Sequence, residues 1–155
     1  MEHLTDLNAE LRVEKTDARI VFRGKVDTLE SEILLALCDS PTEYQGLLLD
    51  AVNLLRQVMS SGVTGKPLTA WTLGGMNAEN VQKLSHNPEK MGFAGHIQPS
   101  VSNGRLSLQM NRLRALTREA ELAAIRAYPE EREDLLLAMN RLSSYFYVLQ
   151  LRFAQ

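Results

Sequence analysis

The chain has 155 residues, a formal net charge of −2 and a single cysteine, Cys38. This length predicts one domain over residues 1–155, with a core that needs neither a disulfide nor a structural metal. The near-neutral charge argues against nucleic-acid binding, and no apolar run approaches the roughly 18 residues of a membrane-spanning helix. The polar, acidic start is unlike a targeting peptide, so we expect a cytoplasmic protein.

Apolar residues recur at helical spacing in four long segments, which predicts an all-α fold. We expect a short helix over 77–85 and long helices over 25–38, 42–60, 102–127 and about 130–153. Asp27 is expected to cap the first long helix and Asn103 the third. Residues 1–24 have a mixed pattern, and their structure stays open. The predicted architecture is a bundle of four to five helices.

The segment 61–101 is rich in glycine and proline and separates the second and third long helices. It is far longer than the roughly 2–8 residues that usually join the helices of a bundle. Long connections of this kind more often carry function than merely link elements. We therefore expect this loop to cover or complete a binding site.

Three charged residues lie at positions i, i+4 and i+7 of the third long helix: Arg114, Arg118 and Glu121. This spacing places them on one stripe of the helix. Guanidinium groups can grip phosphate oxygens, and a carboxylate can hold Mg²⁺. The same pattern is typical of a solvated face with helix salt bridges, including one between Arg118 and Glu121. Both interpretations stay open from spacing alone.

Asn140 follows the apolar stripe of the last helix, at the edge of its packed face. An amide there either bonds a neighbouring helix or contacts a ligand. The three histidines (His3, His86 and His96) are scattered and lack the Glu-x-x-His spacing of a di-iron bundle. Phosphate-loop and dinucleotide-binding motifs are also missing.

Taken in order along the chain, several motifs resemble the ATP:cob(I)alamin adenosyltransferases, most of all the ethanolamine-utilisation type. The resemblance depends on Lys15-x-Asp17-x-Arg19, Gly24-x-Val26-Asp27-x-Leu29, Leu84-Ser85-His86, Arg114-x-x-x-Arg118-x-x-Glu121 and Asn140-Arg141-Leu142-Ser143. It implies a helical bundle that transfers the 5′-deoxyadenosyl group of ATP to a reduced corrinoid. Such an enzyme would supply adenosylcobalamin for ethanolamine catabolism, in the cytoplasm or in association with a bacterial microcompartment.

By this resemblance, ATP, Mg²⁺ and cobalamin are the expected ligands. Arg114 and Arg118 would hold the triphosphate, while Glu121 and Asn140 would organise Mg²⁺ and ATP. Lys15, in the segment that is similar to the family's opening segment, is expected to be a cofactor-binding residue.

The resemblance also implies an oligomer with active sites between subunits, expected to be a homotrimer, with a dimer as the alternative. Asp27 would pair across the interface with Arg114. Phe93 and His96, in the long loop, would border the corrin.

Relatives of the ethanolamine type usually carry a further N-terminal region with a histidine and clustered cysteines, for which this sequence has no counterpart. We expect either the catalytic C-terminal part of a longer protein or a stand-alone short form. Two other interpretations stay open: a non-catalytic corrinoid-binding or delivery protein of the same fold, and an oligomerising bundle whose charged stripe is structural.

Overall fold

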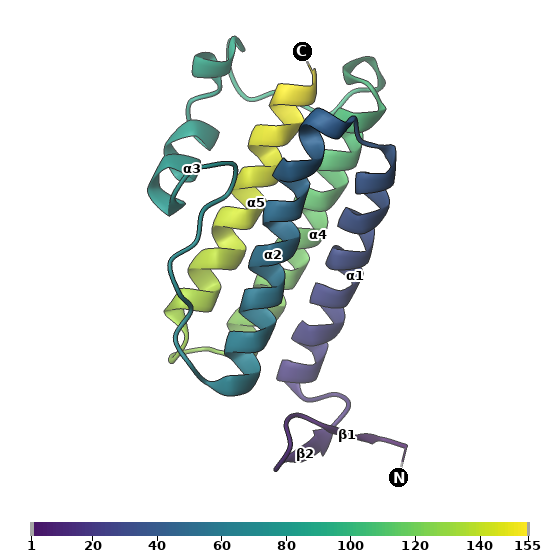
Figure 1. Ribbon diagram of the computed structural model, residues 1–155, viewed down its shortest axis with the longest axis vertical. Helices are drawn as coiled ribbons and strands as arrows, with labels where there is room; N and C mark the ends of the chain where they lie inside the picture. Colours follow the sequence, from purple (N-terminus) through teal and green to yellow (C-terminus); the bar gives the residue numbers. More distant parts are fainter. Residues whose placement is uncertain (1, 155) are drawn as a thin grey trace.

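Four long helices run side by side in the computed structural model, which describes residues 2–154 (Figure 1). They are α1 (Ala18–Asp39), α2 (Thr42–Thr64), α4 (Arg105–Ala127) and α5 (Glu133–Ala154). The segment between α2 and α4 contains the short helix α3 (Ala78–Ser85) and two 3₁₀ turns, η1 (Pro88–Met91) and η2 (Val101–Asn103). The predicted helical bundle with a long connection is confirmed.

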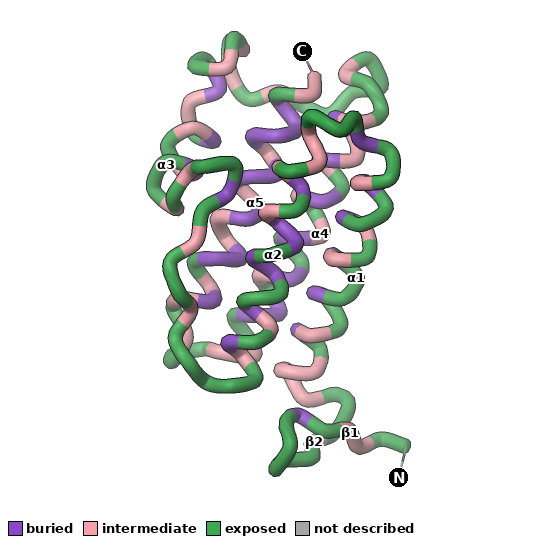
Figure 2. The backbone as a smooth tube through the Cα atoms, viewed as in Figure 1, coloured by how far each residue is buried: buried purple, intermediate pink, exposed green. Residues whose placement is uncertain are grey.

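The core lies between the long helices. Figure 2 shows buried positions along α2 and α5, whereas the N-terminal segment is largely exposed. Helix α5 packs against α2, α3 and α4, and α4 also packs against α1. The predicted apolar stripe of α5 is buried at Leu135, Met139, Leu142, Phe146 and Leu149. This packing holds α4 and α5 together as an antiparallel pair.

Helix α1 begins at Ala18, so the prediction that it starts at residue 25 with Asp27 as its cap is wrong. Asp17 is the cap: its carboxylate accepts hydrogen bonds from the backbone N–H and the guanidinium of Arg19, each at 2.9 Å. These bonds lower the pKa of Asp17 to about 2. Phe22 is buried one turn before Val26, so the apolar stripe continues further towards the N-terminus than expected. Asp27 consequently lies inside the helix, on its exposed side.

Other helix ends also differ from the sequence pattern. Helix α2 continues to Thr64 and ends at Gly65, whose φ of +74° suits a residue without a Cβ. The prediction of Asn103 as a helix cap is wrong, because α4 begins at Arg105, after Gly104. Asn103 instead belongs to η2, where its side chain accepts a hydrogen bond from the backbone of Ser100 at 3.0 Å.

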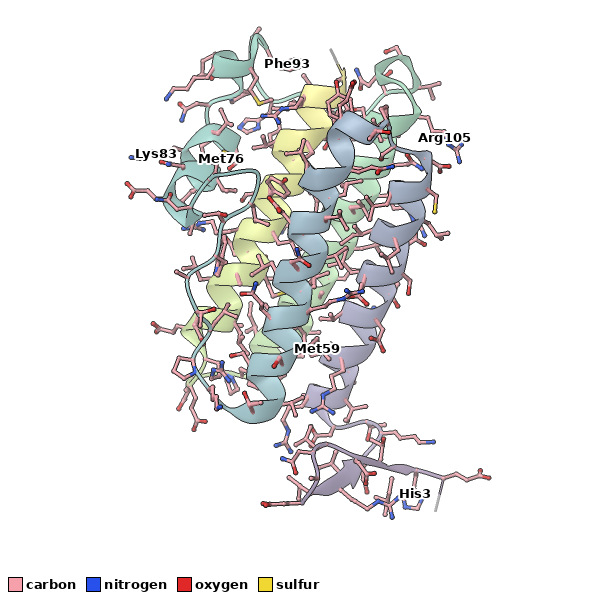
Figure 3. The ribbon with its side chains drawn as sticks, in the orientation of Figure 1. His3, Met59, Met76, Lys83, Phe93 and Arg105 are labelled. Carbon is pink, nitrogen blue, oxygen red and sulfur yellow. The ribbon has the colours of Figure 1, made fainter. Side chains whose placement is uncertain are left out.

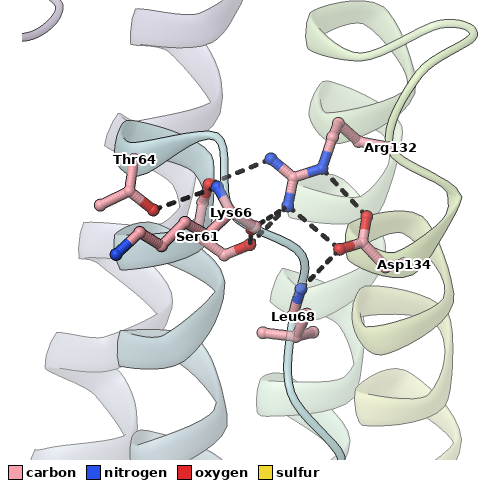
Figure 4. A network of polar contacts seen from close by, with 6 residues as sticks. All are labelled: Ser61, Thr64, Lys66, Leu68, Arg132 and Asp134. Atoms are coloured by element: carbon pink, nitrogen blue, oxygen red, sulfur yellow. Dashed lines mark hydrogen bonds and ion pairs between the residues drawn. The ribbon is translucent and has the colours of Figure 1, made fainter.

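Helix α5 starts at Glu133, where Arg132 and Asp134 form a polar network (Figure 4). Arg132 Nε donates to Asp134 Oδ1 at 3.0 Å, and its other nitrogens donate to the backbone carbonyls of Ser61 and Lys66. Asp134 also accepts from the backbone N–H of Leu68 at 2.8 Å. The network therefore ties the end of α2 and the start of the long connection to α5.

The opening segment, whose structure the sequence pattern left open, forms a hairpin beyond the bundle (Figure 1). Strands β1 (Leu4–Asp6) and β2 (Arg12–Glu14) pair antiparallel, with Thr5 opposite Val13. Arg23 of α1 donates to the backbone carbonyl of Leu7, which fastens the hairpin to the helix. Among residues 2–154, no helix combines the length and apolar character needed to cross a membrane.

Candidate active site

Two stripes of polar side chains face a groove that follows the α4–α5 pair. Helix α4 contributes Asn111, Arg114, Arg118 and Glu121, while α5 contributes Asn140, Ser143, Ser144, Tyr147 and Gln150. The groove consists of two adjoining pockets of about 340 and 370 Å³. They share Arg118, His86, Ser143 and Ser144, and each is large enough for part of a small-molecule ligand.

Arg114 and Arg118 both line the first pocket, as their shared helix stripe predicts. The guanidinium of Arg114 is half-buried and donates twice to Asn111 Oδ1, from Nε at 3.2 Å and from the terminal nitrogen Nη2 at 2.9 Å. Arg118 is exposed, and the described residues offer it neither an ion pair nor a hydrogen bond. The salt bridge to Glu121 that a purely structural stripe predicts is therefore not formed, and Arg118 is available to a ligand.

Glu121 and Asn140 meet across the second pocket. Asn140 Nδ2 donates to Glu121 Oε1 at 3.1 Å, while Asn140 Oδ1 accepts from Arg141 at 2.6 Å. Arg141 also donates to the backbone carbonyl of Ala78 at 3.1 Å and to Gln82 Oε1 at 2.8 Å, both in α3. Because the guanidinium can only donate, it fixes the orientation of the Asn140 amide.

The groove carries an excess of positive charge. Three arginines (Arg114, Arg118 and Arg141) line its two pockets, and Glu121 is the one carboxylate among the lining residues. The chain as a whole has a formal charge of −2, so this excess is local. A concave site of this kind favours a polyanion such as a triphosphate.

The loop after α3 closes one end of the groove, where His96 and Ile97 line the first pocket. His96 Nδ1 lies 2.9 Å from the Tyr147 hydroxyl, and the two rings pack with centroids 5.4 Å apart. Burial raises the pKa of Tyr147, an effect that a hydrogen bond from the Ile97 backbone and the charge of Arg114 reduce without reversing. Tyr147 therefore holds this loop against α5 as a neutral hydroxyl at physiological pH.

Three of the predicted site residues lie outside the groove. Phe93 is in the segment beyond α3, near the end of the bundle where α5 ends (Figure 3), and does not line either pocket. Lys15 is exposed between β2 and α1, at the opposite end of the bundle (Figure 1). Asp27 is exposed on α1. Within one chain, neither Lys15 nor Asp27 lines a pocket with Arg114 or Arg118.

Sequence reasoning missed Asn111, Tyr147 and Gln150, which the structure adds to the groove. A signal was present: polar residues recur at steps of three or four along α5, beside its apolar stripe. Tyr147 follows Phe146 in an apolar helix, where an aromatic side chain is more often part of the core than of a ligand site.

Solved structures of PduO-type ATP:corrinoid adenosyltransferase variants from Lactobacillus reuteri share this fold. One, complexed with ATP, superposes with a TM-score of 0.76 at 20% identity over 97% of this chain and 88% of that chain. Another, complexed with cobalamin and ATP, gives 0.77 at 20% identity over 99% and 86%.

Sequence relatives give a closer match. The chain is 33% identical over 153 residues to the corrinoid adenosyltransferase EutT of Escherichia coli K12, and 32% identical to that of Salmonella typhimurium LT2. Each alignment covers 96% of this chain and 57% of the relative, so the chain spans little more than half the length of these proteins. The family model described as cobalamin adenosyltransferase matches residues 2–153. The chain therefore belongs to the cobalamin adenosyltransferase family.

Proposed function

We propose that this chain transfers the 5′-deoxyadenosyl group of ATP to the cobalt of a reduced corrinoid. The observation that carries the proposal is Arg118, a guanidinium with no hydrogen-bond or ion-pair partner among residues 2–154, in a positively charged groove beside the Glu121–Asn140 pair. Membership of the cobalamin adenosyltransferase family supports the same chemistry. We further propose that residues 1–155 act as one adenosyltransferase-like domain, because one hydrophobic cluster spans the helices.

The reaction needs no nucleophile from the protein. Cobalt(I) supplies an electron pair that forms a Co–C bond at C5′ of ATP, and cobalt is formally oxidised to cobalt(III). The C5′–O bond breaks, and its electron pair leaves with the triphosphate. Arg114 and Arg118 would bind this leaving group and stabilise the charge that develops on its bridging oxygen. The groove walls orient the two substrates and exclude water.

Glu121 fits a role in holding Mg²⁺ that enters with ATP. Its contact with Asn140 engages Oε1, and residues 2–154 contain no cluster of three or more potential metal ligands. One carboxylate is sufficient, because Mg²⁺ commonly keeps phosphate oxygens and waters as its other ligands. When bound, the ion supplies charge neutralisation to the triphosphate. Asn140, held by Arg141, keeps the Glu121 carboxylate in place.

A second subunit would complete the site, and we propose a homotrimer, with a dimer as the alternative. Asp27 is exposed and has no ion-pair partner in the described part of the chain. Among the described residues, the guanidinium of Arg114 donates only to the neutral amide of Asn111. An ion pair between Asp27 of one copy and Arg114 of another would satisfy both charges, and it would bring the segment with Lys15 to a neighbouring groove.

The corrin would lie at the loop end of the groove, against His96 and Ile97, with Phe93 further along the same loop. We place this activity in the supply of adenosylcobalamin for ethanolamine catabolism, in the cytoplasm or in association with a bacterial microcompartment. The test is to mix the protein with reduced cobalamin, ATP and Mg²⁺ and to follow the absorbance change as the light-sensitive Co–C bond forms. The control is the same reaction mixture without the protein, in which the absorbance change is followed in the same way.

Two results would contradict the proposal. A folded protein that binds corrinoid but neither binds nor consumes ATP would be a binding or delivery protein. A protein that binds neither ligand would be a structural bundle.

A further inference from the structure

His86 lies where the two pockets of the groove adjoin. It follows α3 directly and is exposed, and it lines both pockets together with Arg118, Ser143 and Ser144. Among residues 2–154, its ring has neither a hydrogen bond nor an ion pair. A ligand that extends from one pocket into the other would therefore pass His86.

The imidazole ring is not needed to close the end of α3. The backbone carbonyl of Gln82 accepts a hydrogen bond from the backbone N–H of His86 at 3.1 Å. Asn87 donates to the next two carbonyls, to that of Lys83 from Nδ2 at 2.5 Å and to that of Leu84 from its backbone N–H at 3.2 Å. These bonds satisfy three of the last four carbonyls of the helix, which are the groups that a histidine at a helix end often binds. The ring is therefore available to a ligand.

Contacts between α3 and α5 hold His86 at this place. Arg141 of α5 donates to the backbone carbonyl of Ala78 at 3.1 Å and to Gln82 Oε1 at 2.8 Å. Gln82 precedes His86 by about one helical turn, and its backbone carbonyl is the acceptor for the His86 N–H. The end of α3 is thus fastened to the bundle before any ligand binds, which reduces the entropy lost when a ligand meets His86.

The neighbours of His86 indicate that the ligand group is a phosphate. Arg118 lines both pockets with it, and Arg114 and Arg141 each line one of them, so an anion is favoured at the junction. An imidazole carries at least one N–H in every protonation state and can donate it to a phosphate oxygen. Because the backbone N–H of His86 is bonded inside α3, the ring supplies the donor that remains for a ligand.

We propose that His86 donates a hydrogen bond to the triphosphate of ATP, and this inference rests on the proposed function above. Arg114 and Arg118 would bind the phosphates from α4, while the imidazole would bind them from the long connection between α2 and α4. The connection would then belong to the nucleotide site as well as to the corrin site. Adenosine, which has no phosphates, would gain nothing from the ring.

The test compares the wild-type protein with His86→Phe, which keeps a ring but has no donor, and with His86→Gln, which keeps an N–H donor without the ring. Lys83→Ala is the matched control on α3, because Lys83 is an exposed cation that pairs with Glu79 at 2.8 Å and lines neither pocket. Isothermal titration calorimetry gives the dissociation constants of ATP with Mg²⁺, inorganic tripolyphosphate, adenosine and oxidised cobalamin. Thermal melts without ligand report whether each variant is folded.

We expect His86→Phe to weaken the binding of ATP and of tripolyphosphate about tenfold, since one hydrogen bond to a charged group is lost. His86→Gln should stay within about threefold of the wild type, because it keeps a donor. Lys83→Ala should change these constants less than about twofold, because solvent and salt screen an exposed charge outside the groove. Adenosine and cobalamin should bind every variant equally. Melting temperatures should stay within about 2 °C of the wild type, as the exposed ring has no hydrogen bond to lose among the described residues.

Several results would overturn the inference. If His86→Phe binds tripolyphosphate as the wild type does, the ring is merely solvated, and if its affinity for cobalamin falls instead, the ring meets the corrin. Equal losses in His86→Phe and His86→Gln would show that the N–H donor is not what the phosphates need. Because the titrations need no catalysis, tripolyphosphate binding that depends on His86 in a protein without adenosyl transfer would support this inference and refute the proposed function. Normal transfer with unaffected binding in His86→Phe would do the reverse.

Discussion

Removing the guanidinium of Arg118 tests the assignment of the groove most directly. Arg118 has no partner within the described chain, so its hydrogen bonds are expected to go to the ligand. A hydrogen bond to a charged group contributes about 1.5–3 kcal/mol. Arg118→Ala should therefore lower kcat/KM for ATP roughly 10- to 150-fold, at about 1.4 kcal/mol per factor of ten. The free energy of unfolding should change by less than about 0.5 kcal/mol, because Arg118 is exposed and has no hydrogen bond or ion pair to lose among the described residues.

Arg112→Ala is the matched control on the same helix. Arg112 faces α1, where its guanidinium makes two hydrogen bonds of 3.1 Å to the carboxylate of Glu32. We expect this variant to keep full adenosyl-transfer activity and to lose a little thermal stability. Initial rates at varied ATP concentration and thermal melts measure both effects. Equal activity losses in the Arg112 and Arg118 variants would refute the assignment of α4 faces, as would a large destabilisation by Arg118→Ala.

Three further changes are expected to have distinct effects. Glu121→Gln should raise the KM for ATP and shift the Mg²⁺ dependence to higher concentration, whereas an unchanged Mg²⁺ titration would exclude a role in holding the ion. The hydrogen bonds from Arg132 lower the pKa of Asp134 from 3.8, its value in the unfolded chain, to about 2. The ionised carboxylate therefore stabilises the fold fully at a pH above about 4, and this stability is lost as the pH falls from about 4 to 2. Asp134→Asn should therefore lower the free energy of unfolding by about 1 kcal/mol at pH 7, after allowance for partial exposure of the carboxylate. In thermal melts recorded at several pH values, the variant should lose less stability than the wild type between about pH 4 and pH 2. An equally steep loss in both proteins would contradict the assignment. Tyr147→Phe should free the loop at His96, which limited proteolysis would detect as faster cleavage there, with Tyr44→Phe as the control.

Much of this structure is determined by local sequence. The spacing of apolar residues predicts the long helices and the buried stripe of α5, because helical periodicity depends only on neighbours along the chain. The same periodicity places Arg114 and Arg118 on one side of α4 and Arg112 on another. The first helix shows the limit of such reasoning: the apolar spacing predicts a start at residue 25 with Asp27 as the cap, whereas the helix begins at Ala18 and buries Phe22.

The tertiary structure decided which polar groups meet. That Asn140 contacts Glu121 rather than solvent depends on the pairing of α4 with α5, and the anchoring of α3 by Arg141 depends on the path of the long connection. That the described part of the chain offers no hydrogen-bond partner to Arg118 or to Gln150 Oε1 is likewise a property of the assembled packing. Sequence patterns fix the face on which a side chain lies, but its partners come from elements far away in the chain. For this reason the helices were predictable from the sequence, and the shape and charge of the groove were not.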